Sequence, residues 1–466
     1  MKRVAILVFL ATLPALAQQQ NTELSRLGDS CGEFKVLPCL TTLFTDHPFH
    51  FAVSSLAPGN GFAVGPALTF THHTKPNRIK GPDGDTETNW RLQWDTDAVV
   101  SDNLSWRAGV YMKARYTRIP PTVVVNGPGS AGGADLRPKS LLFAAYAQTE
   151  SLNKLSYYGI GQKSSRSALA FYGQRETIAG GNALLPLWNR LNLSFFGEAN
   201  ARVVNLRSET NDGGPSIERV YTPVTAPGLG FQSASFVQFA EGLQLTPSWK
   251  DRFGLNYAAT VQEYASPGSN SSFNRLVLDL GHTLSLYGKS TAAQPRGFNG
   301  PDSCALNDAD RKDACPKPVM SENLEGSIAF RFLLTESFVP SGNAVPFYFQ
   351  PTLGGSDING NNFLPSYADY RFRAPNLMLF RESFEHSIGK LPAGFIFMAD
   401  EGQVAATRGG LGFGNFVHSF AAGVTLRAGG FPVLSVLFAW GGNEGTHTIA
   451  QVNQSLLGGG GRPSLY

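Results

Sequence analysis

The sequence predicts an all-β protein, a transmembrane β-barrel, on three observations. Segments of about ten residues with alternating apolar and polar side chains recur from Phe62 onward, as in barrel strands. No stretch of the later chain reaches the roughly 18 apolar residues that a membrane-spanning helix requires. The composition, with 51 Gly and 33 Phe in 466 residues and only 16% charged residues, suits short strands joined by tight turns.

The N-terminus has the order of a secretory signal peptide. The basic residues Lys2 and Arg3 precede an apolar run, which ends in the small-residue site Ala15-Leu16-Ala17. Residues 1–17 are therefore expected to be removed during export. Residues 18–61 are expected to form a periplasmic N-terminal segment, and residues 62–466 the barrel.

Residues 275–286 contain the clearest strand alternation. The apolar set is Leu276, Leu278, Leu280, Leu284 and Leu286, and the polar set is Arg275, Asp279, Thr283 and Ser285. Alternation alone does not separate a membrane barrel from a soluble sandwich, because both have one apolar face and one polar face. Strand length, the signal peptide and aromatic residues near strand ends favour lipid outside and water inside.

Strand counting predicts 16 antiparallel strands, from about 62–74 to about 447–457. The long links are expected on the extracellular side, at 75–87, 120–139, 209–228 and 339–375. The short turns are expected on the periplasmic side with both termini, at 101–103, 152–155, 246–252, 389–393 and 429–432. An even number of strands lets the barrel close and satisfy its edge hydrogen bonds, so segment 49–57 is interpreted as lying before the barrel.

Four cysteines allow three disulfide pairings. The two local bridges, Cys31–Cys39 and Cys304–Cys315, fit an oxidising periplasm. The cysteines lack a C-x-x-C spacing and a nearby histidine, so no metal site is expected.

The sequence contains no pattern that predicts an enzyme. The eight His residues do not gather around a Ser or Asp, and His282 lies in register with apolar residues on the expected outer face. The formal charge of +3 is too small to indicate a nucleic-acid partner. No cofactor is expected.

The stretch from Pro346 to Ala405 carries the most specific pattern. A strand reaches the corner Leu353-Gly354-Gly355, a long polar loop ends in Arg371-Phe372-Arg373, and the following hairpin carries Asp400-Glu401-Gly402. This pattern resembles the bacterial surface antigen family, the outer-membrane barrels of BamA-like assembly factors. In that family the Leu-Gly-Gly corner opens a long sixth extracellular loop, which closes on an Arg-Phe-Arg-like run.

The resemblance implies that the loop tip folds into the lumen and that a tip Arg meets a wall acid, here Asp400. The tip aligns with 364–367 or, alternatively, with 358–360, and neither alignment contains an Arg. The resemblance leaves Arg371 or Arg373 as the cation for Asp400, and another lumen cation such as Arg331 or Arg427 is the alternative. The candidate residues for the long loop and the lumen are Gly354, Gly355, Arg371, Arg373, Glu382, Asp400 and Gly402.

The resemblance implies insertion or translocation of protein or lipid at the outer membrane of a Gram-negative cell. Outer-membrane lipids, unfolded outer-membrane proteins and periplasmic proteins are the expected partners. No repeat of about 75 mixed α/β residues precedes the barrel, so the family's periplasmic polypeptide-transport domains are expected to be missing. The alternatives are a passive pore for small solutes, with lumen charges such as Arg107 and Asp279, or a structural or surface-interaction barrel using loops 120–139 and 209–228.

Overall fold

The computed structural model describes residues 48–75, 77–79, 86–119, 141–188, 191–209, 214–249, 252–287, 326–389, 391, 393–428, 431–452 and 462–465. The strands are β1 (Phe49–Ser55), β2 (Phe62–His73), β3 (Asn77–Ile79), β4 (Thr86–Ser101), β5 (Trp106–Ile119), β6 (Leu142–Tyr157), β7 (Ala170–Trp188), β8 (Leu193–Ser208), β9 (Ala234–Leu245), β10 (Ser248–Trp249), β11 (Phe253–Ala265), β12 (Phe273–Ser285), β13 (Gly326–Phe338), β14 (Thr352–Leu353), β15 (Phe372–Arg373), β16 (Asn376–Ser387), β17 (Ala393–Ala405), β18 (Val417–Ala428), β19 (Phe431–Gly442) and β20 (Gly445–Val452). The short helices are η1 (Arg166–Ala168), α3 (Ile217–Val220), η3 (Phe347–Phe349) and η4 (Arg408–Gly410). No helix in these ranges is long and apolar enough to cross a membrane.

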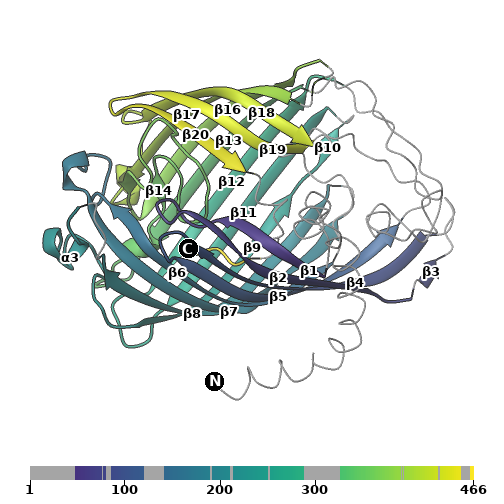
Figure 1. Ribbon diagram of the computed structural model, residues 1–466, viewed down its shortest axis with the longest axis horizontal. Coiled ribbons are helices and arrows are strands. Elements are labelled where there is room, and N and C mark those ends of the chain that lie inside the picture. Colours follow the sequence, from purple (N-terminus) through teal and green to yellow (C-terminus); the bar gives the residue numbers. More distant parts are fainter. Residues whose placement is uncertain are drawn as a thin grey trace, which may run out of the picture.

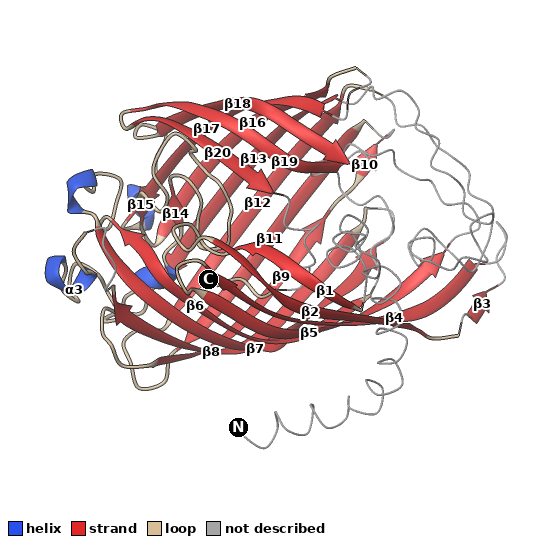
Figure 2. Ribbon diagram, viewed as in Figure 1, coloured by secondary structure: helices blue, strands red, loops and turns tan. Residues whose placement is uncertain are grey.

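Sixteen strands form one antiparallel meander that curves into a barrel (Figures 1 and 2). Each is hydrogen-bonded to its neighbours in the order β1-β2-β4-β5-β6-β7-β8-β9-β11-β12-β13-β16-β17-β18-β19-β20. The short strands β3 and β10 extend this sheet, whereas β14 and β15 form a separate two-stranded sheet inside the barrel. The predicted fold class and strand number are confirmed.

The barrel has an inside-out distribution of side chains. On β12, Leu278 faces outward, while Arg275 and Asp279 face the lumen. Large apolar side chains elsewhere are exposed on the outer face, including Trp94, Val110, Phe239, Phe330, Phe397 and Phe438. Buried polar side chains line the inside, including Asp97, Arg107, Gln148, Glu176, Arg202, Gln238 and Asp400. A soluble sandwich would bury the apolar set, so this arrangement fits a barrel surrounded by lipid.

Segment 49–57 is part of the barrel, and its interpretation as a pre-barrel segment is wrong. Phe49–Ser55 pairs along its whole length with β2, from Phe49 opposite Leu68 to Ser55 opposite Phe62. The alternating burial of this strand, with His50, Ala52 and Ser54 turned inward, matches a barrel wall.

The predicted turn at 152–155 is also wrong, because β6 continues through it. The pairing of β6 with β7 shifts register between Leu152 and Leu155, which marks a β-bulge. The backbone N–H of Asn153 donates to Ser105 Oγ and that of Lys154 to Asn60 Oδ1, each at 2.9 Å. These polar residues therefore form an anchored bulge, although their composition is typical of a turn. The prediction omitted β1 and divided β6 into two strands. These two errors offset each other in the count, so the predicted total of 16 strands agrees with the structure.

The continuous β6 changes which links share an end of the barrel. The strands that flank residues 120–140 and 286–325 are joined through them at the end where β1 begins. The strands that flank 209–233 and the long loop 339–375 are joined at the other end, called here the long-loop end. The expectation that 120–139 and 209–228 share one side is therefore wrong. The signal peptide and the four cysteines lie outside the described residues.

The two ends of the meander, β1 and β20, form the seam of the barrel. β1 pairs only with β2 and β20 only with β19, and the described residues contain no backbone pairing between β1 and β20. β1 has seven residues and β20 has eight, whereas the other wall strands have at least 12.

Candidate functional site: the long loop in the barrel lumen

The long loop 339–375 enters the barrel (Figure 2). Its aromatic side chains pack against the inner wall. Phe347 and Phe349 of η3 are fully buried. The Phe347 ring meets Tyr157 of β6 and Tyr172 of β7, each at 5.0 Å between ring centroids. On the neighbouring strands, Phe349 meets Phe236 of β9, Tyr264 of β11 and Phe273 of β12. These edge and tilted contacts attach the loop to five wall strands.

Gly354 and Gly355, the predicted Gly-Gly corner, lie where the two arms of the loop approach each other. Gly354 and Gly355 have φ values of +96° and +56°, which side chains disfavour. A Cβ on Gly354 would lie 2.5 Å from Arg371 Cβ, and one on Gly355 would lie 2.3 Å from an Asp369 oxygen. Only glycines permit this close approach of the two arms of the loop.

Asp400 lies fully buried in β17 and holds the loop tip, but its cation is neither Arg371 nor Arg373. The Leu364 N–H donates to Asp400 Oδ2 at 2.8 Å, so a residue of segment 364–367 makes the contact with Asp400. Arg381 of β16 binds both Asp400 oxygens, through Nε at 2.7 Å and Nη2 at 2.6 Å. Arg381 and Asp400 are direct partners in the β16–β17 register, so the wall itself supplies both charges.

The Arg381 guanidinium also binds the loop directly, because its Nη2 donates to the Asn362 carbonyl at 2.5 Å. The tip gains a further bond where the Ser366 N–H donates to Ser419 Oγ of β18 at 2.8 Å. Backbone groups at the tip thus replace the side-chain cation that the resemblance implied.

Gly402 provides space for the loop on the wall. A Cβ at this position would lie 2.7 Å from Leu353 Cδ1 and 3.4 Å from Leu364 Cδ1, and both leucines are buried. Gly402 is therefore a packing position for the loop.

Arg373, at the end of the long loop, contacts η3 and the aromatic side chains around it. Its Nη1 donates to the Phe347 carbonyl at 2.6 Å, and its guanidinium lies 5.8 Å from the Tyr157 ring centroid. Arg275 of β12 donates to the Phe349 carbonyl in the same way. Cations on both sides therefore satisfy the buried carbonyls of η3.

Two consecutive loop residues contact the two sides of the seam at the long-loop end. The Tyr370 hydroxyl donates to the carbonyl of Pro58, in the β1–β2 turn, at 3.4 Å. Burial raises the pKa of the Tyr370 phenol well above its usual value, so the hydroxyl stays a donor. Arg371 pairs with Glu444, in the β19–β20 turn, and donates to the Ser164 carbonyl at 2.7 Å. The loop therefore bridges the two seam hairpins.

Glu382 is not a lumen residue, so its assignment to the loop and lumen set is wrong. It is exposed on β16, opposite Phe330, whereas its neighbour Arg381 points inward to Asp400. The two-residue period of a strand places adjacent residues on opposite faces, and Glu382 has the outward register. His282 likewise faces outward, as expected, and bonds Tyr257 at 2.6 Å.

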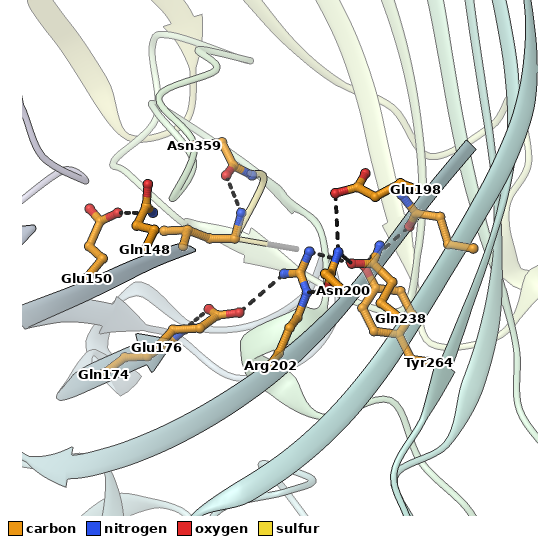
Figure 3. A network of polar contacts seen from close by, with 12 residues as sticks. Gln148, Glu150, Gln174, Glu176, Glu198, Asn200, Arg202, Gln238, Tyr264 and Asn359 are labelled. Atoms are coloured by element: carbon orange, nitrogen blue, oxygen red, sulfur yellow. Dashed lines mark hydrogen bonds and ion pairs between the residues drawn. The ribbon is translucent and has the colours of Figure 1, made fainter. Parts of the chain in front are cut away.

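The inner wall carries a polar network that the strand pattern did not single out (Figure 3). Arg202 Nη1 donates to Glu176 Oε1 at 3.2 Å, and Arg202 also bonds Gln238. Gln238 accepts from Asn200 at 2.9 Å and donates to the Tyr264 hydroxyl at 3.1 Å. Because the Tyr264 ring also packs on Phe349, this network supports the wall against which the loop lies. Polar residues on alternate strand positions were visible in the sequence, but the partners come from different strands.

The described part of the chain contains no group of three or more His, Cys, Asp or Glu side chains that could hold a metal ion.

No protein-family model matches the chain, and no curated protein matches it in sequence. Solved structures with a similar course of the chain include CdiB from Acinetobacter baumannii, with 10% identity and a TM-score of 0.43. They also include BamA from Haemophilus ducreyi lacking POTRA domains 1-3, with 12% identity and a TM-score of 0.41, and CdiB from Escherichia coli, with 10% and 0.41.

These similarities cover 86%, 88% and 84% of this chain, in the same order. The chain spans 58% of the length of each CdiB chain and 76% of that of the BamA chain.

Proposed function

We propose that the chain is an outer-membrane β-barrel that inserts or translocates polypeptide through the seam between β1 and β20. The observation that carries this proposal is the pair of short seam strands without mutual backbone pairing among the described residues. β1 and β20 are the first and last strands of the meander, and each pairs with one neighbouring strand in the described part of the chain.

The first and last strands of a sheet are the places where a further strand can add. A client segment would join the sheet there by β-augmentation, with main-chain hydrogen bonds that do not depend on its sequence.

The long loop supports the same function by controlling the seam. Tyr370 and Arg371 bridge the β1–β2 and β19–β20 turns, so opening at the long-loop end requires these contacts to break. The aromatic packing of η3 on one side and the Asp400 contacts on the other place the loop across the lumen. A passive pore for small solutes is less well supported, because the loop occupies the path.

The direct test compares folding of an unfolded small outer-membrane barrel in liposomes with and without the purified full chain. We expect the chain to accelerate folding. If the rate stays that of empty liposomes, insertion of barrels is excluded as its activity.

The seam itself is tested by photocrosslinking with benzoylphenylalanine at Phe51 of β1. The matched control is the same group at Phe330 of β13, which is also an outward-facing phenylalanine but lies in the middle of the sheet. We expect crosslinks to the client from position 51 and background from position 330. Equal yields would contradict entry at the seam.

A further inference from the structure

Residues 462–465 lie inside the barrel, although they follow β20 in the chain (Figure 1). Arg462 Nη2 lies 2.7 Å from Asp97 Oδ2 of β4, and the Leu465 N–H donates to Asn359 Oδ1 of the long loop at 2.8 Å. The Leu465 side chain is 4% exposed, and Pro463 is also buried. The segment of four residues is thus held at its first residue by the barrel wall and at its last residue by the long loop.

Asp97, which Arg462 contacts, has other hydrogen-bond partners on the barrel wall. Asp97 Oδ2 also accepts from Arg107 of β5 at 3.1 Å, and its Oδ1 lies 3.4 Å from the Tyr111 hydroxyl. Tyr111 in turn donates to Gln148 at 2.7 Å. Because the wall alone already pairs and orients the Asp97 carboxylate, the carboxylate is preorganised to receive a second guanidinium.

The apolar end of the site combines the first strands with the loop. Leu465 belongs to the buried cluster that contains Ala52 of β1, Val99 of β4 and Ile358 of the loop. Proline has no N–H, so burying Pro463 leaves no backbone donor unpaired. The adjacent Asn359 lies in a turn held by Asp357, whose Oδ1 accepts from the Asn359 N–H at 2.9 Å.

The position of the segment relates it to the seam. Residues 462–465 continue from β20, the last strand, yet Arg462 contacts β4, which lies beyond β1 and β2 on the other side of the seam. Through Asn359 the same segment is joined to the long loop.

We propose that Asp97, Asn359 and the apolar surface between them form a binding site for an extended peptide with the character Arg-Pro-x-Leu. Residues 462–465 are its resident ligand. In the resting protein this segment joins the last strand, the first strands and the long loop, and an unfolded polypeptide with a similar basic and apolar spacing competes for the site. The competition by a passing client rests on the proposed function, whereas the site itself does not.

The test uses the full chain with Arg462→Gln and Leu465→Asp together, which removes both anchors of the resident segment. The probe is a fluorescein-labelled synthetic peptide with the sequence of residues 459–466, and its binding is measured by fluorescence anisotropy. We expect the double variant to bind the peptide at least about tenfold more tightly than the wild type, whose site is filled.

Two controls test the chemistry of the site. Adding Asp97→Asn to the double variant should weaken binding about tenfold or more, because the guanidinium loses a charged partner. A peptide with Gln in place of its Arg should bind the double variant equally weakly. Retention of the folded band on an unheated denaturing gel verifies that each variant barrel is intact. If a variant with Asp97→Asn does not fold, the Gln peptide still tests the acidic end.

Equal binding to the wild type and the double variant, or no binding to either, would overturn the proposal. Peptide binding without acceleration of client folding would refute the proposed function alone. Acceleration without peptide binding would refute only the self-occupied site.

Discussion

At the residue scale, Asp400 shows what a motif specifies and what it leaves open. The Asp-x-Gly run predicted a wall acid at Asp400, and Asp400 is buried and accepts from the loop tip. The role of Gly402 as a position that the loop packs against comes from the structure. The motif did not identify Arg381, because its role depends on the β16–β17 register and not on the loop. The loop sequence suggested Arg371 or Arg373 as this cation. Arg371 instead pairs with Glu444 in the β19–β20 turn, and Arg373 donates to the Phe347 carbonyl of η3.

The buried Arg381–Asp400 pair should be important for stability. Arg381→Met leaves the fully buried Asp400 carboxylate without its cation, and we expect it to lower the free energy of unfolding by about 3–5 kcal/mol. Urea titration with a gel readout of the folded barrel measures this change.

The control for this prediction is Arg331→Met, which breaks the Arg331–Asp279 pair in the same lumen. Those side chains are 36% and 29% exposed, so its loss should cost only about 1 kcal/mol or less. Equal costs for the two variants would show that burial of Asp400 does not set the difference. The double variant Arg381→Met with Asp400→Leu should recover only part of the lost stability, because it removes the unpaired buried charge but leaves the buried Leu364 N–H without its acceptor.

Gly402→Ala should loosen the loop without disturbing the strand. The new methyl group meets Leu353 at 2.7 Å, and overpacking of this kind costs about 1–3 kcal/mol. Gly254→Ala in β11 is the matched control, since a Cβ there meets no atom within 4 Å. We expect faster protease cleavage of the long loop in Gly402→Ala only. Unchanged cleavage would mean that the loop does not depend on this contact.

At the element scale, the strands follow their two-residue period closely. The predicted turn at 152–155 is wrong because polar residues interrupt this period there. Asn153 and Lys154 have turn-like composition but form a bulge, because Ser105 and Asn60 from other hairpins accept their backbone N–H groups. Those acceptors are remote in sequence. A strand assignment based on local pattern alone cannot include them.

The outer face of β12 gives a direct test of the lipid boundary. Leu278→Arg should cost about 2–4 kcal/mol in the membrane, because Leu278 faces outward between Ala259 and Leu334. Its neighbour Val277 has the opposite register, so Val277→Arg should cost much less. Reconstitution yield and urea midpoint in lipid vesicles measure both. A neutral Leu278→Arg would contradict contact with the membrane core.

At the scale of the whole molecule, the corrected course of β6 reassigns the ends of the barrel. Links 120–140 and 209–233 leave the sheet at opposite ends. The long loop shares its end with 209–233, and the bridges of Tyr370 and Arg371 lie there as well.

Cysteine labelling of intact cells tests this assignment. We expect a membrane-impermeant maleimide to react at Gly213→Cys, on the long-loop end, and to leave Ala131→Cys protected until the outer membrane is opened. Reaction of both cysteines in intact cells would mean that 120–139 and 209–228 share one side of the membrane, as the sequence predicted. This result would contradict a continuous β6. The reverse pattern would place the long-loop end in the periplasm.

The sequence by itself determined the class of fold, and it predicted the Gly-Gly corner and an acid on the wall facing the loop tip. Its total of 16 strands agrees with the structure only because two errors cancelled. These features depend on local periodicity, on backbone conformations that require glycine, and on a short motif. Only the tertiary structure decided that 49–55 is a strand, that Arg381 is the partner of Asp400, that Glu382 faces outward, and that 462–465 occupies the lumen. Each of these depends on the register between strands or on contacts between residues far apart in the chain, and hydrogen bonding and burial in the folded sheet select them.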